Sequence, residues 1–493
     1  MATPIPINRC QFSPSEIVRA TGAIAHAFSL SGAQDMLITG VSIDTRSIAA
    51  DALFVALRGV RDGHEFIGEA AAHGAAAAVV ERGRADAEFP CFEVEDTMVA
   101  LGALARFHLN RMRALRPVPT IAIGGAAGKT TTKELTAALA RALFGEILAT
   151  PGNLNNLIGV PMTILTLTDA HRAAVLECGT NQRGEIARLA EIVAPDVALV
   201  LNVDIEHTEG LGSLEGVADE EAELFNTGRI AIVGTAESML LARVPAAMRT
   251  LKFGATADAG VRLASRVVVA PGRQRIALAL ERSLTADGVD ATLEANLGLL
   301  GAASAMNAAA AVAAVSAAYA RPLGRNDLGA MARALAAVEP VAGRLSTREV
   351  ASVIVIDDTY NANPRSVRVA LEAARETADG LHTRLLVALG DMLELGTLAP
   401  AMHVEAVRDI YRARPDACVA VGPEMAAAIR TVESRAAEPD ADFPARPSVL
   451  EFAPDSTTAA AAVRGLVRAG DVLLVKGSRG IAMERIINAL AGA

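Results

Sequence analysis

The residues of this chain best suited to bind phosphate lie at positions 122–135, where the sequence reads AIGGAAGKTTTKEL. Gly128 is followed directly by Lys129 and Thr130, so a cation and a hydroxyl stand where a glycine-rich loop would enter a helix. The N–H groups and positive dipole end of a helix favour phosphate oxygens, lysine neutralises them, and threonine can bind Mg²⁺. Ile123 replaces the first glycine of the usual G-x-x-x-x-G-K-[ST] pattern, which makes this a shorter phosphate loop or a plain glycine-rich turn.

A phosphate loop of this kind needs a strand before it and a helix after it. Residues 118–123 form a short apolar run, and beyond Lys129 the side chains of Leu135 and Leu139 fall on one face of a helix that Gly145 would end. The sequence therefore predicts a strand-to-helix connection, which favours phosphate binding over a plain turn.

Polar groups also follow other predicted strands. Short apolar runs alternate with helical patterns through most of the chain, as is typical of βαβ units and parallel sheets. Four of these runs finish in a polar residue: AAVLE at Glu177, VIVIDD at Asp358, LLVALGD at Asp391 and VLLVKG at Lys476. Open α/β sheets bind ligands outside the carboxyl ends of their strands, so we expect the binding site at these ends.

The length of 493 residues is too great for one ordinary hydrophobic core, and it suggests about three domains. Prolines in RALRPVPT, at 113–120, and the segment VEPVAGRLS, at 338–346, indicate linkers. We therefore predict an α/β protein with an N-terminal domain at 1–115, a central domain at 116–344 and a C-terminal domain at 345–493.

The composition excludes several classes of protein. A net charge of −10 argues against a polyanion as the main partner, so we expect no nucleic-acid binding. The four cysteines are scattered without a C-x-x-C pair, which indicates neither a zinc knuckle nor a disulfide framework and fits a reducing cytoplasm. Residues 1–10 lack the apolar stretch of a secretory signal. Residues 295–320 carry no charge, but their Ala, Gly, Asn and Ser content predicts a buried helix and not a transmembrane segment.

Four further motifs, together with the compact G-x-x-G-K-T loop, resemble those of the Mur ligases. They are GNLNNLIGVPMTIL at 152–165, DDTYNANPRS at 357–366, LGDMLELG at 389–396 and VKGSRGIAME at 475–484. The segments VSIDTRSIAADALFVALRG and DGHEF are also similar, so the resemblance runs from about residue 40 to the C-terminus. A ligase that adds the third peptide residue would carry D-x-x-R and D-Y-A-H motifs, whereas this chain has D-T-Y-N-A-N-P.

The resemblance implies a fold and an activity. It implies an N-terminal UDP-substrate-binding α/β domain, a central parallel-sheet P-loop ATPase domain and a C-terminal Rossmann-like α/β domain. In the family, ATP with Mg²⁺ converts the carboxylate of UDP-N-acetylmuramoyl-tripeptide to an acyl phosphate, and the amine of D-alanyl-D-alanine then attacks it. We expect a cytoplasmic, monomeric enzyme of peptidoglycan synthesis. The alternatives are a Mur-type amide ligase with another amine acceptor and a non-catalytic nucleotide-binding relative.

The resemblance also assigns roles to individual positions. The ATP site takes Gly125, Gly128, Lys129, Thr130, Thr131, Asn307, Arg344 and Asp358. The metal site takes Thr130, Glu177 and His207, and the catalytic set is Lys129, Glu177, His207 and Asp358. The substrate site takes Ser42, Asp44, Thr45, Arg46, Asn153, Asn155, Asn156, Tyr360, Asn361, Asn363, Lys476, Ser478 and Arg479. Without the resemblance, most of these positions would be interpreted as polar turns or solvated strand ends.

One position departs from the family pattern at the metal. Ligases of this family commonly carry a carbamoylated lysine in the helix after His207, whereas GVADEEAELF, at 216–225, has Glu221 at that point. Two interpretations are open. Glu221 supplies a permanent negative charge to a second Mg²⁺ through a water bridge, or it is an ordinary exposed acid in an acidic run.

Two other departures concern the adenine. The family's H-N-x-x-N helix start is reduced here to Ala303, Ser304 and then Asn307, and GTAES, at 234–238, replaces an N-x-D motif. We therefore expect an intact phosphate end of the nucleotide site, with adenine held weakly or by other residues.

Overall fold

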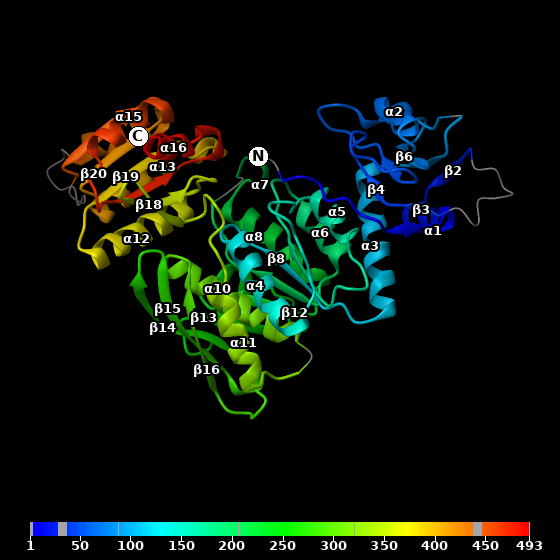
Figure 1. The fold of residues 1–493 in the computed structure, drawn as a ribbon, viewed down its shortest axis with the longest axis horizontal. Helices are drawn as coiled ribbons and strands as arrows, with labels where there is room; N and C mark the ends of the chain where they lie inside the picture. Colours follow the sequence, from blue (N-terminus) through cyan, green and yellow to red (C-terminus); the bar gives the residue numbers. More distant parts are fainter. Residues whose placement is uncertain are drawn as a thin grey trace.

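The structure is a computed structural model that describes residues 3–27, 37–86, 88–205, 208–319, 321–436 and 446–492. Three α/β lobes follow one another along the chain, and the N-terminal and C-terminal lobes stand on opposite sides of the central lobe (Figure 1). The three-domain α/β fold class predicted from the sequence is confirmed.

The N-terminal lobe contains a small two-stranded sheet and a five-stranded sheet in the order β2-β7-β6-β5-β4. The strands are β1 (Gln11–Phe12), β2 (Ile24–His26), β3 (Ile38–Thr39), β4 (Val41–Ser42), β5 (Leu53–Val55), β6 (Ala77–Glu81) and β7 (Cys91–Val94). The helices are α1 (Pro14–Thr21), α2 (Ile67–Ala72) and α3 (Thr97–Leu115). Helix α3 packs against α1 of its own lobe and also against helices of the central lobe, so it joins the two.

The central lobe is built on a nine-stranded sheet in the order β16-β15-β14-β13-β12-β11-β8-β10-β9. Its strands are β8 (Thr120–Gly124), β9 (Leu148–Ala149), β10 (Ala174–Glu177), β11 (Val197–Val200), β12 (Ile230–Gly234), β13 (Arg249–Gly254), β14 (Val261–Ala270), β15 (Arg273–Leu280) and β16 (Ala291–Leu297). Its helices are α4 (Lys129–Phe144), α5 (Gly159–Ile164), α6 (Glu185–Val193), α7 (Thr208–Leu211), α8 (Leu214–Ala222), α9 (Ser238–Leu241), α10 (Gly301–Ala318) and α11 (Arg325–Ala336). Strands β8 to β14 pair in parallel, whereas β14, β15 and β16 form an antiparallel extension that the sequence did not predict.

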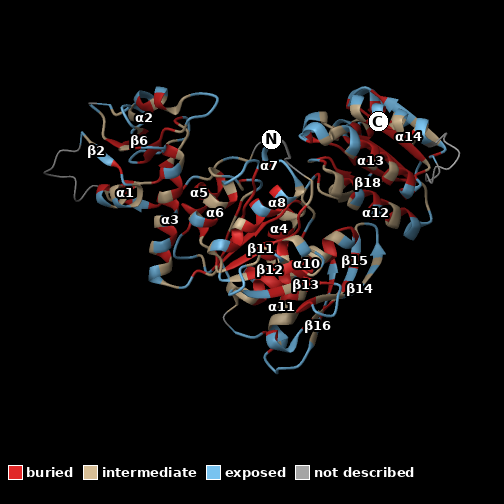
Figure 2. Cartoon of the chain, turned by 180° about the vertical axis from the view of Figure 1, so that it is seen from behind, coloured by how far each residue is buried: buried red, intermediate tan, exposed pale blue. Residues whose placement is uncertain are grey.

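Helices cover both faces of this sheet because neighbouring strand residues point in opposite directions. Ala122, on β8, packs in the cluster that includes α3, α6 and α8, whereas Ile121 and Ile123 pack in the cluster that includes α4 and α10. Figure 2 shows the buried residues concentrated in the strands and in α10. A strand with two buried faces is held rigidly, so the loop that follows β8 starts from a fixed point.

Helix α10 is the segment that raised the question of a membrane span. Among the described residues it is the one helix long and apolar enough to cross a bilayer, and 67% of it is buried inside the protein. It packs against α4 and strands β11 to β14, which agrees with the predicted buried helix. The helix begins later than predicted, at Gly301, because Ala295 belongs to β16.

The C-terminal lobe has a six-stranded sheet in the order β17-β18-β22-β19-β20-β21, parallel except for the edge strand β17. Its strands are β17 (Ser346–Val350), β18 (Val353–Asp358), β19 (Leu385–Gly390), β20 (Ala417–Val421), β21 (Val449–Ala453) and β22 (Val472–Lys476). Its helices are α12 (Pro364–Leu381), α13 (Ala399–Ala413), α14 (Pro423–Ala436), α15 (Ser456–Leu466) and α16 (Glu484–Ala491). The predicted strand ends at Asp358 and Lys476 are confirmed, and the register pairs these two residues across β18 and β22.

Candidate active site between the central and C-terminal domains

The loop between β8 and α4 requires glycine at two positions. Gly125 has φ +118° and Gly128 has φ +87°, a region that L side chains rarely adopt. A Cβ at Gly125 would also lie 2.9 Å from the backbone N of Leu201, and a Cβ at Gly128 would lie 3.0 Å from Nδ2 of Asn307. The short loop is therefore a specific backbone shape and not a flexible turn.

The first N–H groups of this loop are bound to the protein itself. The N–H of Gly125 donates to Oε2 of Glu221 at 2.6 Å, and the N–H of Ala126 donates to the carbonyl of Asn202 at 3.0 Å. Nδ2 of Asn202 donates to the Ala127 carbonyl at 2.9 Å, and its Oδ1 accepts from the Ala127 N–H at 2.8 Å. The loop is thus anchored up to Ala127, and it leads into the N-terminus of α4, the end of a helix that favours an anion.

Asn202 is a residue that sequence reasoning missed. It lies two residues beyond the end of β11 and is 7% exposed. The available signal was an amide immediately after a buried apolar run, DVALVLNV, at the edge of the sheet where ligands bind.

Lys129 lies half-buried at the start of α4 and lines the cavity. Its Nζ donates to the carbonyls of Gly125 and, at 3.2 Å, Ala126. The ammonium group therefore lies over the loop, on the side where a phosphate would bind, and it is not sealed in the core.

Glu177, at the end of β10, is 1% exposed. Its Oε1 accepts from Nδ2 of Asn155 at 2.8 Å and from Oγ1 of Thr130 at 3.1 Å. Its Oε2 is buried without a hydrogen-bond partner among the described residues. A buried carboxylate oxygen without a partner is costly, and this one stands beside a threonine hydroxyl at the cavity wall. This donor set fits a hard cation such as Mg²⁺.

Glu221 is fully buried, so its interpretation as an exposed acid is wrong. Three acids of the run, Asp219, Glu220 and Glu221, lie on α8, and Glu220 and Glu221 are on its buried face. Glu220 accepts from the N–H groups of Gly184 at 2.7 Å and Ile186 at 2.8 Å, at the start of α6, while Asp219 stays on the surface. Helix α8 therefore braces both the phosphate loop and the loop after Glu177. Glu221 lies behind the phosphate loop and is absent from the cavity wall.

Cys178 lies near two buried acids, Glu177 and Glu221. Burial, with added repulsion from the Glu221 and Glu177 carboxylates, raises the pKa of the Cys178 thiol. The thiol stays protonated at neutral pH, which makes it inert as a nucleophile.

The C-terminal domain contributes a buried ion pair. Nζ of Lys476 lies 2.6 Å from Oδ2 of Asp358 and also donates to the carbonyl of Asn361 at 2.9 Å. Oδ1 of Asp358 accepts from the N–H of Leu345 at 3.0 Å. Lys476 is 1% exposed, so the pair fixes the loop after β18. Beside it, the guanidinium of Arg344 stacks 4.0 Å from the centre of the Tyr360 ring.

These groups surround one cavity of about 580 Å³ between the two domains. This volume is suited to a nucleotide-sized ligand. Most of the predicted ATP, metal and substrate residues line it: Gly128, Lys129, Thr130, Thr131, Asn153, Asn155, Glu177, Asn307, Arg344, Asp358, Tyr360, Asn361, Asn363 and Lys476. The cavity is also lined by Thr235, which follows β12, by Phe253 near the end of β13 and by Ser304 at the start of α10.

Other predicted positions lie away from this cavity wall. They are Gly125, Asn156, Glu221, Ser478 and Arg479, and in the N-terminal domain Ser42, Asp44, Thr45 and Arg46. Position 207, the predicted histidine, lies outside the described residues.

Three of these outlying groups already have partners. Oγ of Ser478 accepts from the N–H of Leu393 at 2.8 Å, and Arg479 pairs with Glu484. Arg46 is largely exposed and forms two hydrogen bonds with Asp44, which lower the pKa of that carboxyl group.

Comparisons with known proteins cover almost the whole chain. A Mur ligase middle domain matches residues 123–315, a Mur ligase glutamate ligase domain matches residues 343–479, and a Mur ligase family catalytic domain matches residues 37–109. The UDP-N-acetylmuramoyl-tripeptide–D-alanyl-D-alanine ligase of Escherichia coli is 35% identical over 92% of this chain and 94% of its own length. The chain belongs to the Mur ligase family.

Solved structures agree with this assignment. A crystal structure of MurF from Acinetobacter baumannii aligns with a TM-score of 0.84 at 26% identity, over 99% of this Mur ligase and 100% of that chain. MurF from Thermotoga maritima in complex with ADP aligns with a TM-score of 0.75 at 26% identity, over 92% and 97%. As a member of this family, the protein is an ATP-dependent, amide-forming ligase.

Proposed function

We propose that this Mur ligase joins D-alanyl-D-alanine to the carboxylate of UDP-N-acetylmuramoyl-tripeptide, in the cytoplasmic stage of peptidoglycan synthesis. The main support is the cavity in which the phosphate loop and Glu177 of the central domain face Asp358 and Lys476 of the C-terminal domain. The choice of substrates rests on the full-length similarity to ligases named for this reaction in several bacteria, including Escherichia coli and Bacillus subtilis.

Activation of the carboxylate is the chemical problem that such a site must solve. A carboxylate is a poor electrophile at neutral pH, and ATP, when bound, supplies the phosphoryl group that converts it to an acyl phosphate. Lys129 and the first N–H groups of α4 bind the phosphates and offset the negative charge that develops during transfer. The anchoring of the loop by Asn202 and Glu221 keeps these groups in place before the nucleotide arrives.

Mg²⁺ would be held by Glu177 and Thr130. The unpartnered Oε2 of Glu177 supports this, because it offers a buried negative oxygen that no described protein group satisfies. Asn155 holds the other oxygen of the same carboxylate and sets its orientation. The metal would neutralise phosphate charge that Lys129 alone cannot.

The C-terminal domain completes the site and excludes water. Asp358 and Lys476 hold the loop at Tyr360 and Asn361 against the cavity, and water must be kept out because it would hydrolyse an acyl phosphate. The amine must therefore enter a site that both domains enclose.

A phosphate-release assay over a panel of amine acceptors tests the proposal. Release that needs UDP-tripeptide and D-alanyl-D-alanine together is the expected result. Release with another amine would identify a different Mur-type ligase, and nucleotide binding without release under any combination would indicate a non-catalytic relative.

A further inference from the structure

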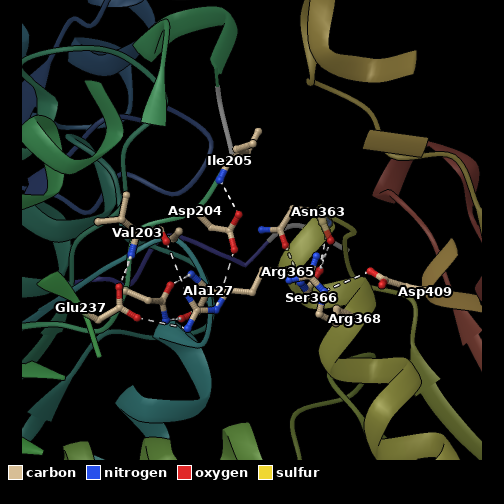
Figure 3. Close-up of polar contacts among 12 residues, drawn as sticks. Ala127, Val203, Asp204, Ile205, Glu237, Asn363, Arg365, Ser366, Arg368 and Asp409 are labelled. Atoms are coloured by element: carbon tan, nitrogen blue, oxygen red, sulfur yellow. Dashed lines mark hydrogen bonds and ion pairs between the residues drawn. The ribbon is translucent and has the colours of Figure 1, made fainter. Parts of the chain in front are cut away.

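Helix α12 joins the C-terminal domain to the central domain through Arg365 (Figure 3). Nη2 of Arg365 lies 3.3 Å from Oε1 of Glu237, Nη1 lies 3.4 Å from the carbonyl oxygen of Val203, and Nε lies 4.0 Å from Oδ2 of Asp204. All three partners belong to the central domain, where they follow β11 and β12. A single side chain thus reaches three groups of the neighbouring domain.

The partners of Arg365 are held in place by hydrogen bonds within the central domain. Oε2 of Glu237 accepts from the N–H of Val203 at 3.3 Å, and Oδ1 of Asp204 accepts from the N–H of Ile205 at 2.6 Å. The side chains of Glu237 and Asp204 are only 16% and 24% exposed. Two fixed and partly buried carboxylates repel each other, so a cation between them stabilises the arrangement. Arg365 supplies this cation only when the two domains are together.

The start of α12 determines where Arg365 points. Oδ1 of Asn363 accepts from the N–H of Ser366 at 2.8 Å, Oγ of Ser366 accepts from the N–H of Asn363 at 3.0 Å, and Pro364 occupies the first helical turn. This capping box rigidly connects the helix to the loop at Tyr360 and Asn361. The position of Arg365 is therefore coupled to the position of the loop that faces the phosphate site.

A second contact fixes the other part of the same helix. Glu376 accepts two hydrogen bonds from Arg266 of β14, at 2.8 and 2.5 Å. This pair lies about 16 Å along the helix from Arg365, and neither residue lines the cavity. Arg266 also contacts Gln274, which is buried and bonds to the carbonyls at the start of α10. Helix α12 thus packs against α10 of the central domain and is also tied to that domain by two arginine contacts, of which only Arg365 lies at the cavity.

We infer that Arg365 is a positioning residue for the ligation reaction. Its contacts with Asp204 and Glu237 hold Asp358, Tyr360 and their neighbours over the phosphate loop, while the Arg266–Glu376 pair acts as the pivot about which the C-terminal domain opens. This inference rests on the proposed function for its kinetic part but not for its structural part.

Arg368 provides a matched control on the same helix. It lies one turn beyond Arg365, and its Nε lies 3.2 Å from Oδ2 of Asp409, a residue of the C-terminal domain itself (Figure 3). Removing Arg368 therefore deletes an arginine ion pair of α12 without touching the contact between domains.

The test compares Arg365→Ala, Arg365→Lys and Arg368→Ala by small-angle X-ray scattering and by steady-state kinetics. We expect Arg365→Ala to increase the radius of gyration and to lower kcat/KM for the amine by about 5- to 30-fold, the effect of losing a partly buried pair. Affinity for ATP should change less than twofold. Arg365→Lys should recover part of the loss, and Arg368→Ala should resemble the wild type in both measurements.

A second set of variants tests the partners. In an Asp204→Asn, Glu237→Gln background, Arg365→Ala should add no further loss, because the charges that it bridges are already gone. Equal behaviour of Arg365→Ala and Arg368→Ala in scattering and kinetics would overturn the inference. A wild-type protein without amine-dependent turnover would refute the proposed function instead, and the scattering comparison would still decide the role of Arg365.

Discussion

Replacement of Asn202 by Ala tests whether the phosphate loop is held ready for the nucleotide. The change removes two hydrogen bonds to Ala127, of 2.8 and 2.9 Å, from a side chain that is 7% exposed. A typical hydrogen bond contributes about 1 kcal/mol net, so the loop loses about 2 kcal/mol of local stability. ATP binding must then restore the order of the loop, and if this costs the full amount, about 2 kcal/mol, ATP affinity should fall roughly 30-fold.

Isothermal titration calorimetry with Mg²⁺ and a non-hydrolysable ATP analogue measures this loss directly. Asn226→Ala is the matched control, because Asn226 is exposed and bonds only to Glu223 through its amide nitrogen. Circular dichroism melting curves show whether each variant remains folded at the temperature of the titration. If folded Asn202→Ala binds the analogue within twofold of the wild type, the loop keeps its shape without this side chain and our reasoning is wrong.

Three other substitutions address the metal and the buried charges. Glu177→Gln should reduce ligation at least 100-fold and weaken Mg²⁺-dependent nucleotide binding, measured by titration in Mg²⁺ and in EDTA, because it removes the negative oxygen that we assign to the metal. If Glu221 only anchors Gly125, Glu221→Ala should lower ATP affinity at every Mg²⁺ concentration. A loss of ATP affinity that high Mg²⁺ rescues would instead support a second metal ion at Glu221. Unchanged kinetics would exclude both roles. Asp358→Asn should lower the free energy of unfolding of the C-terminal domain by about 3–5 kcal/mol, because it leaves the Lys476 ammonium group buried without its counter-ion. Denaturant titrations measure this change, and a loss below about 1 kcal/mol would contradict the prediction.

The sequence by itself determined the fold class and most of the strand ends that form the site. Apolar runs that finish in Glu177, Asp358 and Lys476 are recognisable because a strand buried on both faces has to be apolar until it reaches the edge of its sheet. The glycine at 128 and the lysine at 129 were recognisable for a similar reason, since a tight strand-to-helix turn and a phosphate cradle restrict the residue types that fit.

Tertiary structure alone decided what the acidic run at 219–223 does. Helical periodicity shows that Asp219 and Glu221 point in different directions, but not which direction faces the protein. The core against which α8 packs places Glu221 under Gly125 and leaves Asp219 with Arg243 on the surface. The partner of a buried charge is far away in the sequence, so local patterns do not contain it.

The same limit applies to Asn202 and Arg365. Each looks like an ordinary polar residue at an element end, and each acts on a group that a different part of the chain supplies: Ala127 for Asn202, and Glu237 for Arg365. Residue types and spacings identify the chemistry that a segment can perform, because they reflect local backbone geometry. The distances between segments follow from how sheets and domains pack, and these distances exist only in the folded chain.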